Sequence, residues 1–148
     1  MWRELVGPRT HAVLRIAVGL LFMQHGLQKH FGFFGGINGE TVPLLSMLGL
    51  AGALELVGGL FLIFGLFVRP VAVVLLLEMI SAYFIAHVSR GGWPIQNQGE
   101  LALLYASVFV FLAGNGAGPF SVDHALAGSG VAAGERRQLK DRRHAAAA

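Results

Sequence analysis

Four long apolar stretches recur along this chain of 148 residues and restrict its fold more than any other feature. They cover residues 12–30, 44–67, 70–88 and 99–115. A helix that crosses a bilayer needs about 20 mostly apolar residues, and each stretch comes close to that length. The pattern predicts an all-α, polytopic membrane protein whose four transmembrane helices form one bundle.

The composition agrees with this fold class. Only 13% of the residues are charged, whereas soluble domains carry about 25%. The chain has no cysteine, which excludes disulfides, cysteine-bound zinc, iron–sulfur clusters and a dithiol redox centre within it. Five of the eleven lysines and arginines lie between Arg136 and Arg143. The isoelectric point of about 10.0 therefore reflects a basic tail beside membrane lipid, and no nucleic-acid partner is predicted.

The connections between the stretches are short. Arg69 and Pro70 separate the second stretch from the third, and proline suits the first position of a helix. Segments rich in glycine, asparagine and proline follow the first and third stretches, at residues 32–43 and 89–98.

The end of the chain differs from the rest. The sequence GAGPFSVD closes the fourth stretch, and ALAGSGVAAG, residues 125–134, is typical of a flexible linker. We therefore expect a membrane domain over residues 1–123 and a flexible, basic cytoplasmic tail over residues 124–148.

Charge asymmetry predicts the orientation, because basic residues concentrate in cytoplasmic loops. With four spans, Lys29 and Arg90 lie on one side of the membrane. The basic residues on the other side are Arg3, Arg9, Arg69, Arg136, Arg137, Lys140, Arg142 and Arg143. Both termini are therefore expected in the cytoplasm, and the protein in the cytoplasmic (inner) membrane of a bacterium.

The first stretch leaves an alternative open. Its longest run without a polar side chain is only Ile16 to Met23, and a charged side chain at the centre of a span costs about 2.5–3.5 kcal/mol. Arg15 could extend to the cytoplasmic face and Lys29 to the opposite face. The segment could instead lie in the membrane interface as an amphipathic helix, which would leave three spans.

Polar side chains gather at the predicted helix ends that face away from the cytoplasm. His25 and Lys29 are four residues apart and share a helix face. His87 ends the third stretch, and Asn97 and Glu100 stand at the start of the fourth. These side chains, from three helices, should occupy one layer near the outer membrane face.

Two glutamates lie deeper. At 1.5 Å per residue, Glu55 lies about 16 Å into the second helix and Glu78 about 12 Å into the third. An isolated carboxylate there is costly, so each should be protonated or paired, with Arg15, Lys29 and the two histidines as partners. Buried polar pairs also hold membrane helices in register, and for Arg15 and Glu78 this structural network weighs as much as a function.

Histidines, glycines and aromatic residues add three smaller expectations. His25 and His87 could ligate a haem, although they need not approach each other, and no metal site is predicted. Close helix packing is expected from the glycines of the second stretch, Gly49, Gly52, Gly58, Gly59 and Gly65. An interfacial belt, or the mouth of a pocket for a flat ligand, is expected from Phe31, Phe33, Phe34 and Trp93.

Three blocks of sequence carry a resemblance. Residues 14–36 hold an arginine, a His-Gly pair, a lysine and an aromatic–glycine turn. Residues 50–79 hold a glutamate before two glycines and a Gly-Leu-Phe-x-Arg turn, and residues 97–123 an Asn-x-x-Glu start and a Gly-Pro-x-Ser-x-Asp close. Over residues 14–123 the chain resembles the DoxX family of small four-helix membrane proteins.

The resemblance implies a four-helix bundle and an association with redox processes. One branch of the family is linked to a thiosulfate:quinone oxidoreductase, and another looks like a membrane anchor that gathers a superoxide dismutase and a sulfurtransferase. The family's motif positions fall here on Arg15, His25, Gly26, Lys29, Glu55, Gly58, Gly59, Arg69, Asn97 and Glu100.

Three functions stay open. The first is a redox-associated subunit linked to quinone or to a sulfur or oxidative-stress oxidoreductase, whose electrons come through a partner or a bound cofactor. Its candidate cofactor-binding residues are His25, Lys29, Glu55, His87, Asn97 and Glu100, of which His25, Lys29 and Glu100 would hydrogen-bond a quinone and relay protons.

The second function is a non-catalytic scaffold whose tail, ERRQLKDRRH, recruits a soluble protein or anionic lipid. The third is a small proton-coupled transporter with Glu55 and Glu78 on its path, for which four helices would require a homo-oligomer.

Overall fold

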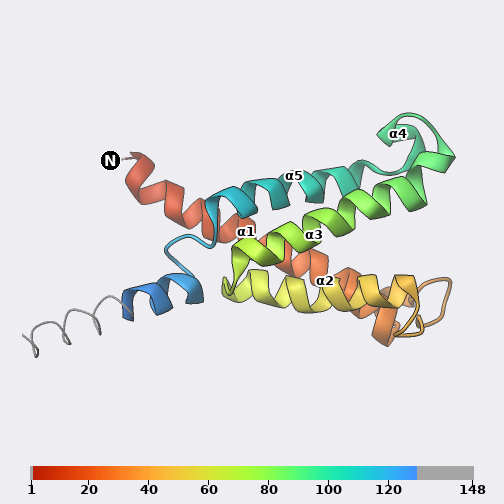
Figure 1. The fold of residues 1–148 in the computed structure, drawn as a ribbon, viewed down its shortest axis with the longest axis horizontal. Coiled ribbons are helices and arrows are strands. Elements are labelled where there is room, and N and C mark those ends of the chain that lie inside the picture. Colours follow the sequence, from red (N-terminus) through yellow and green to blue (C-terminus); the bar gives the residue numbers. More distant parts are fainter. Residues whose placement is uncertain (1, 130–148) are drawn as a thin grey trace, which may run out of the picture.

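The computed structural model describes residues 2–129, and over these residues the chain is mostly helical and contains no strand. Four long helices run lengthwise through the molecule (Figure 1). They are α1 (Trp2–Phe31), α2 (Met47–Phe64), α3 (Val68–Ala82) and α5 (Glu100–Asn115). The prediction of a helical protein is confirmed, and each long helix contains most of one predicted stretch.

Short helical turns complete the chain between the long helices. The turn η1 (Phe33–Gly35) follows α1, and α3 continues through a π-helical turn, η2 (Tyr83–His87), into η3 (Val88–Arg90). A single turn, α4 (Pro94–Asn97), leads into α5.

Two helical segments are long and apolar enough to cross a membrane. They are Met47–Phe64 and the continuous run Val68–Arg90, each with a mean hydropathy of 2.1. The apolar helix α5 is shorter. Large apolar side chains point outward along these helices, as with Leu54, Leu77 and Leu104, which suits a surface that meets lipid.

Local signals define the ends of α2. The hydroxyl of Ser46 accepts a hydrogen bond from the Gly49 amide at 3.0 Å, which caps the first turn. Gly65 ends the helix with φ 69°, a left-handed conformation that costs glycine little. The predicted start of the third helix at Pro70 therefore falls two residues late, because α3 already begins at Val68.

Backbone contacts between glycines set the distance between α1 and α2. A Cβ atom on Gly19 would lie 2.8 Å from the Gly59 carbonyl oxygen, and one on Gly59 would lie 2.8 Å from the Gly19 carbonyl oxygen. Seven residues further along α1, a Cβ on Gly26 would lie 2.7 Å from the Leu56 amide nitrogen. The expectation that glycines of α2 allow close helix packing is confirmed.

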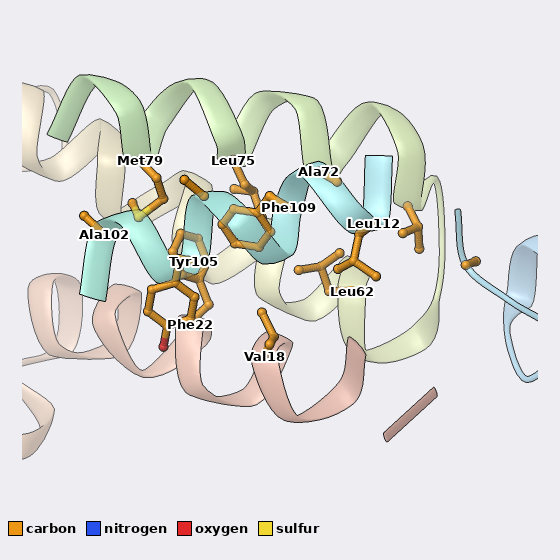
Figure 2. Close-up of a cluster of buried hydrophobic side chains, with 13 residues drawn as sticks. Val18, Phe22, Leu62, Ala72, Leu75, Met79, Ala102, Tyr105, Phe109 and Leu112 are labelled. Atoms are coloured by element: carbon orange, nitrogen blue, oxygen red, sulfur yellow. The ribbon is translucent and has the colours of Figure 1, made fainter. Parts of the chain in front are cut away.

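One buried apolar cluster joins all four long helices (Figure 2). Phe22 of α1 contacts Tyr105 and Phe109 of α5 in edge-to-face pairs, each with ring centroids 5.0 Å apart. The other labelled members are Val18, Leu62, Ala72, Leu75, Met79, Ala102 and Leu112. Over their whole lengths, α1 packs mainly against α2, and α3 mainly against α5.

The chain segment after α5 returns to the turn between α2 and α3. The Asp123 carboxylate accepts hydrogen bonds from the amides of Phe67 at 2.8 Å and Val68 at 3.1 Å. The Asp123 amide donates to the Gly65 carbonyl at 3.0 Å. Asp123 therefore caps α3 from a distant part of the sequence. The Gly-Pro-x-Ser-x-Asp motif, which ends at Asp123, thus packs on the Gly-Leu-Phe-x-Arg turn, which contains Gly65 and Phe67.

Residues 122–129 are helical, so the first part of the predicted linker over residues 125–134 is not irregular. The rest of that linker and the basic tail from residue 130 onward lie outside the described residues. The hypothesis that the tail recruits partners therefore stays a prediction.

Candidate functional site

A cavity of about 280 Å³ lies between the four long helices. Its apolar walls include Phe22 of α1, Met79 of α3, and Leu101 and Ala102 of α5. Its polar lining consists of His25, Lys29, Glu55, His87, Gln98 and Tyr105. Polar groups that converge in an otherwise apolar cavity are typical of a ligand site, and we call this cavity the polar pocket.

An ion pair between two helices lines the polar pocket. The Lys29 Nζ of α1 lies 2.5 Å from the Glu55 Oε1 of α2, and the two side chains are 12% and 6% exposed. The second Glu55 oxygen, Oε2, is buried and has no hydrogen-bond partner among the described residues. The Lys29 ammonium has three donors and uses one of them here. The pair therefore still offers donors and an acceptor to a ligand.

Aromatic rings form a second side of the polar pocket. The His25 ring lies nearly perpendicular to the Tyr105 ring, with centroids 6.0 Å apart, and 6.4 Å from the Phe22 centroid. His25 makes no hydrogen bond that holds its ring nitrogens within the described part of the chain. It is therefore available to donate to, or accept from, a bound molecule.

Asn97 and His87 belong to the turn that closes this end of the molecule. Asn97 is fully buried, and its amide donates to the Gly91 carbonyl at 2.9 Å while its Oδ1 accepts from the Gly99 amide at 2.8 Å. The His87 Nδ1 lies 3.0 Å from the Asn97 carbonyl oxygen, which orients the imidazole. Asn97 does not line the polar pocket, so it positions His87 and does not contact a ligand there.

Glu100 lies apart from the other predicted site residues. It is exposed at the first residue of α5 and does not line the polar pocket. The sequence places it next to Asn97, but the turn directs it away from His25 and Lys29.

Arg15 has a different partner from those expected. It is 1% exposed, so it does not extend to the membrane face, and it binds no glutamate among residues 2–129. Its guanidinium donates to the carbonyls of Leu62 and Ile63, the latter at 2.9 Å, and to that of Phe120 at 2.6 Å. Arg15 therefore binds the carboxyl-terminal end of α2, where a cation also meets the negative end of the helix dipole.

Glu78 lies outside the polar pocket, in a groove between α2 and α3. Both of its carboxylate oxygens are buried without a hydrogen-bond partner among the described residues. Within the part of the chain that the structure describes, the predicted polar network is thus smaller than expected, with one ion pair and one unpaired acid.

Among the described residues, no group of three or more His, Cys, Asp or Glu side chains converges to form a metal site. His25 and His87 do line the same cavity.

Tyr105 and Gln98 line the polar pocket but are not predicted from the sequence. Tyr105 is one of only two tyrosines in the chain and lies within an apolar run, so its hydroxyl was the available signal. Gln98 adopts φ 61°, and nothing in its sequence context indicates that it faces the cavity.

A larger cavity of about 570 Å³ lies near Arg69 and Asp123, at the other end of the molecule. The Asp123 carboxylate there already binds two backbone amides, so this end serves the fold. The polar pocket, with its uncommitted donors and acceptors, is the better candidate for function.

Comparisons with known proteins identify relatives along most of the chain. The model of the DoxX family matches residues 10–88. An uncharacterized protein of Haemophilus influenzae is 43% identical over 127 residues, which cover 82% of this chain and 93% of the relative. An uncharacterized membrane protein of Mycobacterium tuberculosis is 28% identical over 156 residues, covering 91% of this chain and 94% of the relative. No solved structure gives a significant match.

Proposed function

Because the chain belongs to the DoxX family of membrane proteins, we propose that it binds the head group of a lipid-soluble quinone in the polar pocket. In this proposal it serves as a subunit of a redox assembly in the cytoplasmic membrane of a bacterium. A partner or a bound cofactor supplies the electrons, because the chain has no cysteine to hold an iron–sulfur or dithiol centre of its own.

The observation that carries the proposal is the meeting of the Lys29–Glu55 pair with His25 and Tyr105 in one apolar cavity. A quinone is flat and apolar, with carbonyl oxygens that accept hydrogen bonds. The Lys29 ammonium and the Tyr105 hydroxyl are donors of the required kind, and His25 can hold or release a proton as the carbonyl is reduced.

The size of the polar pocket supports the head group as the bound part. Ligand sites usually measure about 300–1,000 Å³, and this one lies at the lower limit at about 280 Å³. A long isoprenoid tail would therefore extend beyond the cavity. The exposed apolar faces of the helices would accommodate that tail together with lipid.

The proposal also includes four membrane spans with both termini in the cytoplasm. The two apolar segments long enough to cross support it directly, and α1 and α5 pack against them along one core. The first turns of α1 and the start of α3, which carry Arg9 and Arg69, lie at the end of the molecule opposite α4, as a cytoplasmic end requires (Figure 1). Alkaline phosphatase fusions after residues 38, 67, 92 and 118 should be active, inactive, active and inactive, in that order; activity at residue 67 would contradict the topology.

The test of quinone binding is retention by gently purified protein. Organic extraction followed by chromatography should recover a quinone from the wild type, and much less from His25→Ala and Glu55→Gln. Glu100→Gln is the matched control, because Glu100 is exposed and outside the polar pocket. Equal retention in all variants, or no quinone in the wild type, would reject the proposal.

A further inference from the structure

We infer that Glu78 is a membrane-embedded, proton-binding carboxylic acid that is reached from the lipid through the groove between α2 and α3. This inference concerns a site separate from the polar pocket and does not depend on which ligand binds there. It stands on the depth of Glu78, on the walls of the groove and on the charges that face the carboxyl group.

Glu78 lies near the middle of a membrane-crossing segment. It is ten residues beyond Val68, the start of the continuous helical run that ends at Arg90. At 1.5 Å per residue this is about 15 Å, half of a hydrocarbon layer of about 30 Å. Water is scarce at that depth, so the protein itself must satisfy or neutralise a carboxylate.

The groove beside Glu78 has a volume of about 450 Å³ and is lined by residues of α2, α3 and η2. Its apolar walls are open to the outside, since Leu54, Leu77 and Ile85 are 41%, 59% and 59% exposed. Glu78 is the only charged residue in the lining. The one polar neighbour, Ser81, already donates its hydroxyl hydrogen to the Leu77 carbonyl at 2.8 Å.

The charges around Glu78 do not balance unless it carries a proton. Lys29 of α1 and Glu55 of α2 are within electrostatic reach of its carboxyl group, but they are bound to each other. The only charged residue in α5 is Glu100, exposed at the start of that helix. Two acids therefore share one base, and both Glu78 oxygens are buried without a hydrogen-bond partner among the described residues. A neutral carboxylic acid avoids most of the cost of this burial.

A protonated carboxyl group in an apolar groove has a diagnostic reaction. One of its oxygens adds to the central carbon of a carbodiimide, and the acid proton passes to a carbodiimide nitrogen. The acyl group of this O-acylisourea then moves from oxygen to nitrogen and forms a stable N-acylurea. The adduct retains all atoms of both reactants. A carboxyl group remote from water reacts only in its protonated form, because the reaction needs the acid proton.

The experiment uses the full chain in lipid nanodiscs at neutral pH, treated with dicyclohexylcarbodiimide and analysed by mass spectrometry. We expect one adduct, mapped to Glu78 in the wild-type peptide, so the result does not require any variant to fold. The adduct should be lost in Glu78→Gln and kept in Glu100→Gln, and it should decrease as the pH rises.

Two further measurements sharpen the test. Lys29→Met removes the single base, so Glu55 should also hold a proton and acquire a second adduct. A water-soluble carbodiimide should modify exposed acids such as Glu40 and Glu100 but not Glu78. The inference is overturned if the hydrophobic reagent leaves Glu78 unmodified in the wild type, or if the water-soluble reagent modifies it equally well.

Discussion

Lys29 and Glu55 join α1 to α2 through a buried ion pair, with 2.5 Å between Nζ and Oε1. Both side chains also line the polar pocket, so the same contact serves the fold and the candidate site. Its free-energy contribution can be separated from its role in ligand binding, because stability is measurable in the ligand-free protein.

Glu55→Gln should destabilise the protein strongly. It leaves the Lys29 ammonium buried without its counter-ion, which typically costs about 3–5 kcal/mol. The combined change Lys29→Met and Glu55→Gln removes both charges and should cost less than Glu55→Gln alone. Reversible denaturation in detergent micelles measures these differences, with Glu100→Gln expected to stay within about 0.5 kcal/mol of the wild type. A double variant less stable than the single one would contradict this account.

Arg15→Met should destabilise the end of α2. The loss leaves the carbonyls of Leu62, Ile63 and Phe120 without their donor, at about 1–3 kcal/mol for each one that stays unsatisfied. Arg15→Lys keeps the charge but cannot reach three carbonyls with a planar fork, so it should restore only part of the stability. Thermal unfolding provides the measurement, with Arg9→Met, at an exposed position, as the control. Full rescue by lysine would show that charge alone matters.

Asp123→Ala should weaken the start of α3 by about 0.5–2 kcal/mol, as the loss of a capping side chain does. Asp123→Asn should cost less, because its single amide oxygen can still accept from Phe67 or Val68, but not from both as the two carboxylate oxygens do. The rate of hydrogen exchange at the amides of Phe67 and Val68 should increase from the wild type to Asp123→Asn and further to Asp123→Ala. Equal exchange in all three proteins would exclude the capping role.

Gly26→Ala should separate α1 from α2 because the added methyl group would lie 2.7 Å from the Leu56 amide nitrogen. Overpacking of this kind costs about 1–3 kcal/mol. Gly114→Ala, a substitution in α5 where nothing lies within 4 Å, is the control and should be neutral or stabilising by up to about 1 kcal/mol. The unfolding free energies of the two variants should therefore change in opposite directions.

The helices were predictable because apolar runs and glycine or proline breaks are local signals. The apolar pattern marks α2, α3 and α5 closely but places the start of α1 at residue 12 instead of Trp2. Hydropathy reports burial or lipid contact, whereas a helix also continues through polar residues. The helix over residues 122–129 was missed for a related reason, since its small residues are equally typical of a linker.

The site was predictable only in part. Position along each helix correctly gathers His25, Lys29 and His87 at one end, because depth follows from a count of residues. The side on which a residue faces depends on how the helices are rotated and crossed. For that reason sequence alone did not reveal that Glu100 points outward, that Tyr105 points inward, or that Arg15 binds carbonyls instead of an acid.

The hydrogen bonds between the two pairs of helices, α1 with α2 and α3 with α5, all lie at one end of the described part of the chain. They are donated by His11 to the Gly116 carbonyl, by Arg15 to the Phe120 carbonyl, and by the Asp123 amide to the Gly65 carbonyl. Around the polar pocket the pairs meet through ring contacts, such as that of Phe22 with Tyr105, and not through hydrogen bonds among the described residues. A small separation of the two pairs about their hydrogen-bonded end would therefore let a bulky ligand enter laterally from the bilayer, while Lys29 stays bound to Glu55.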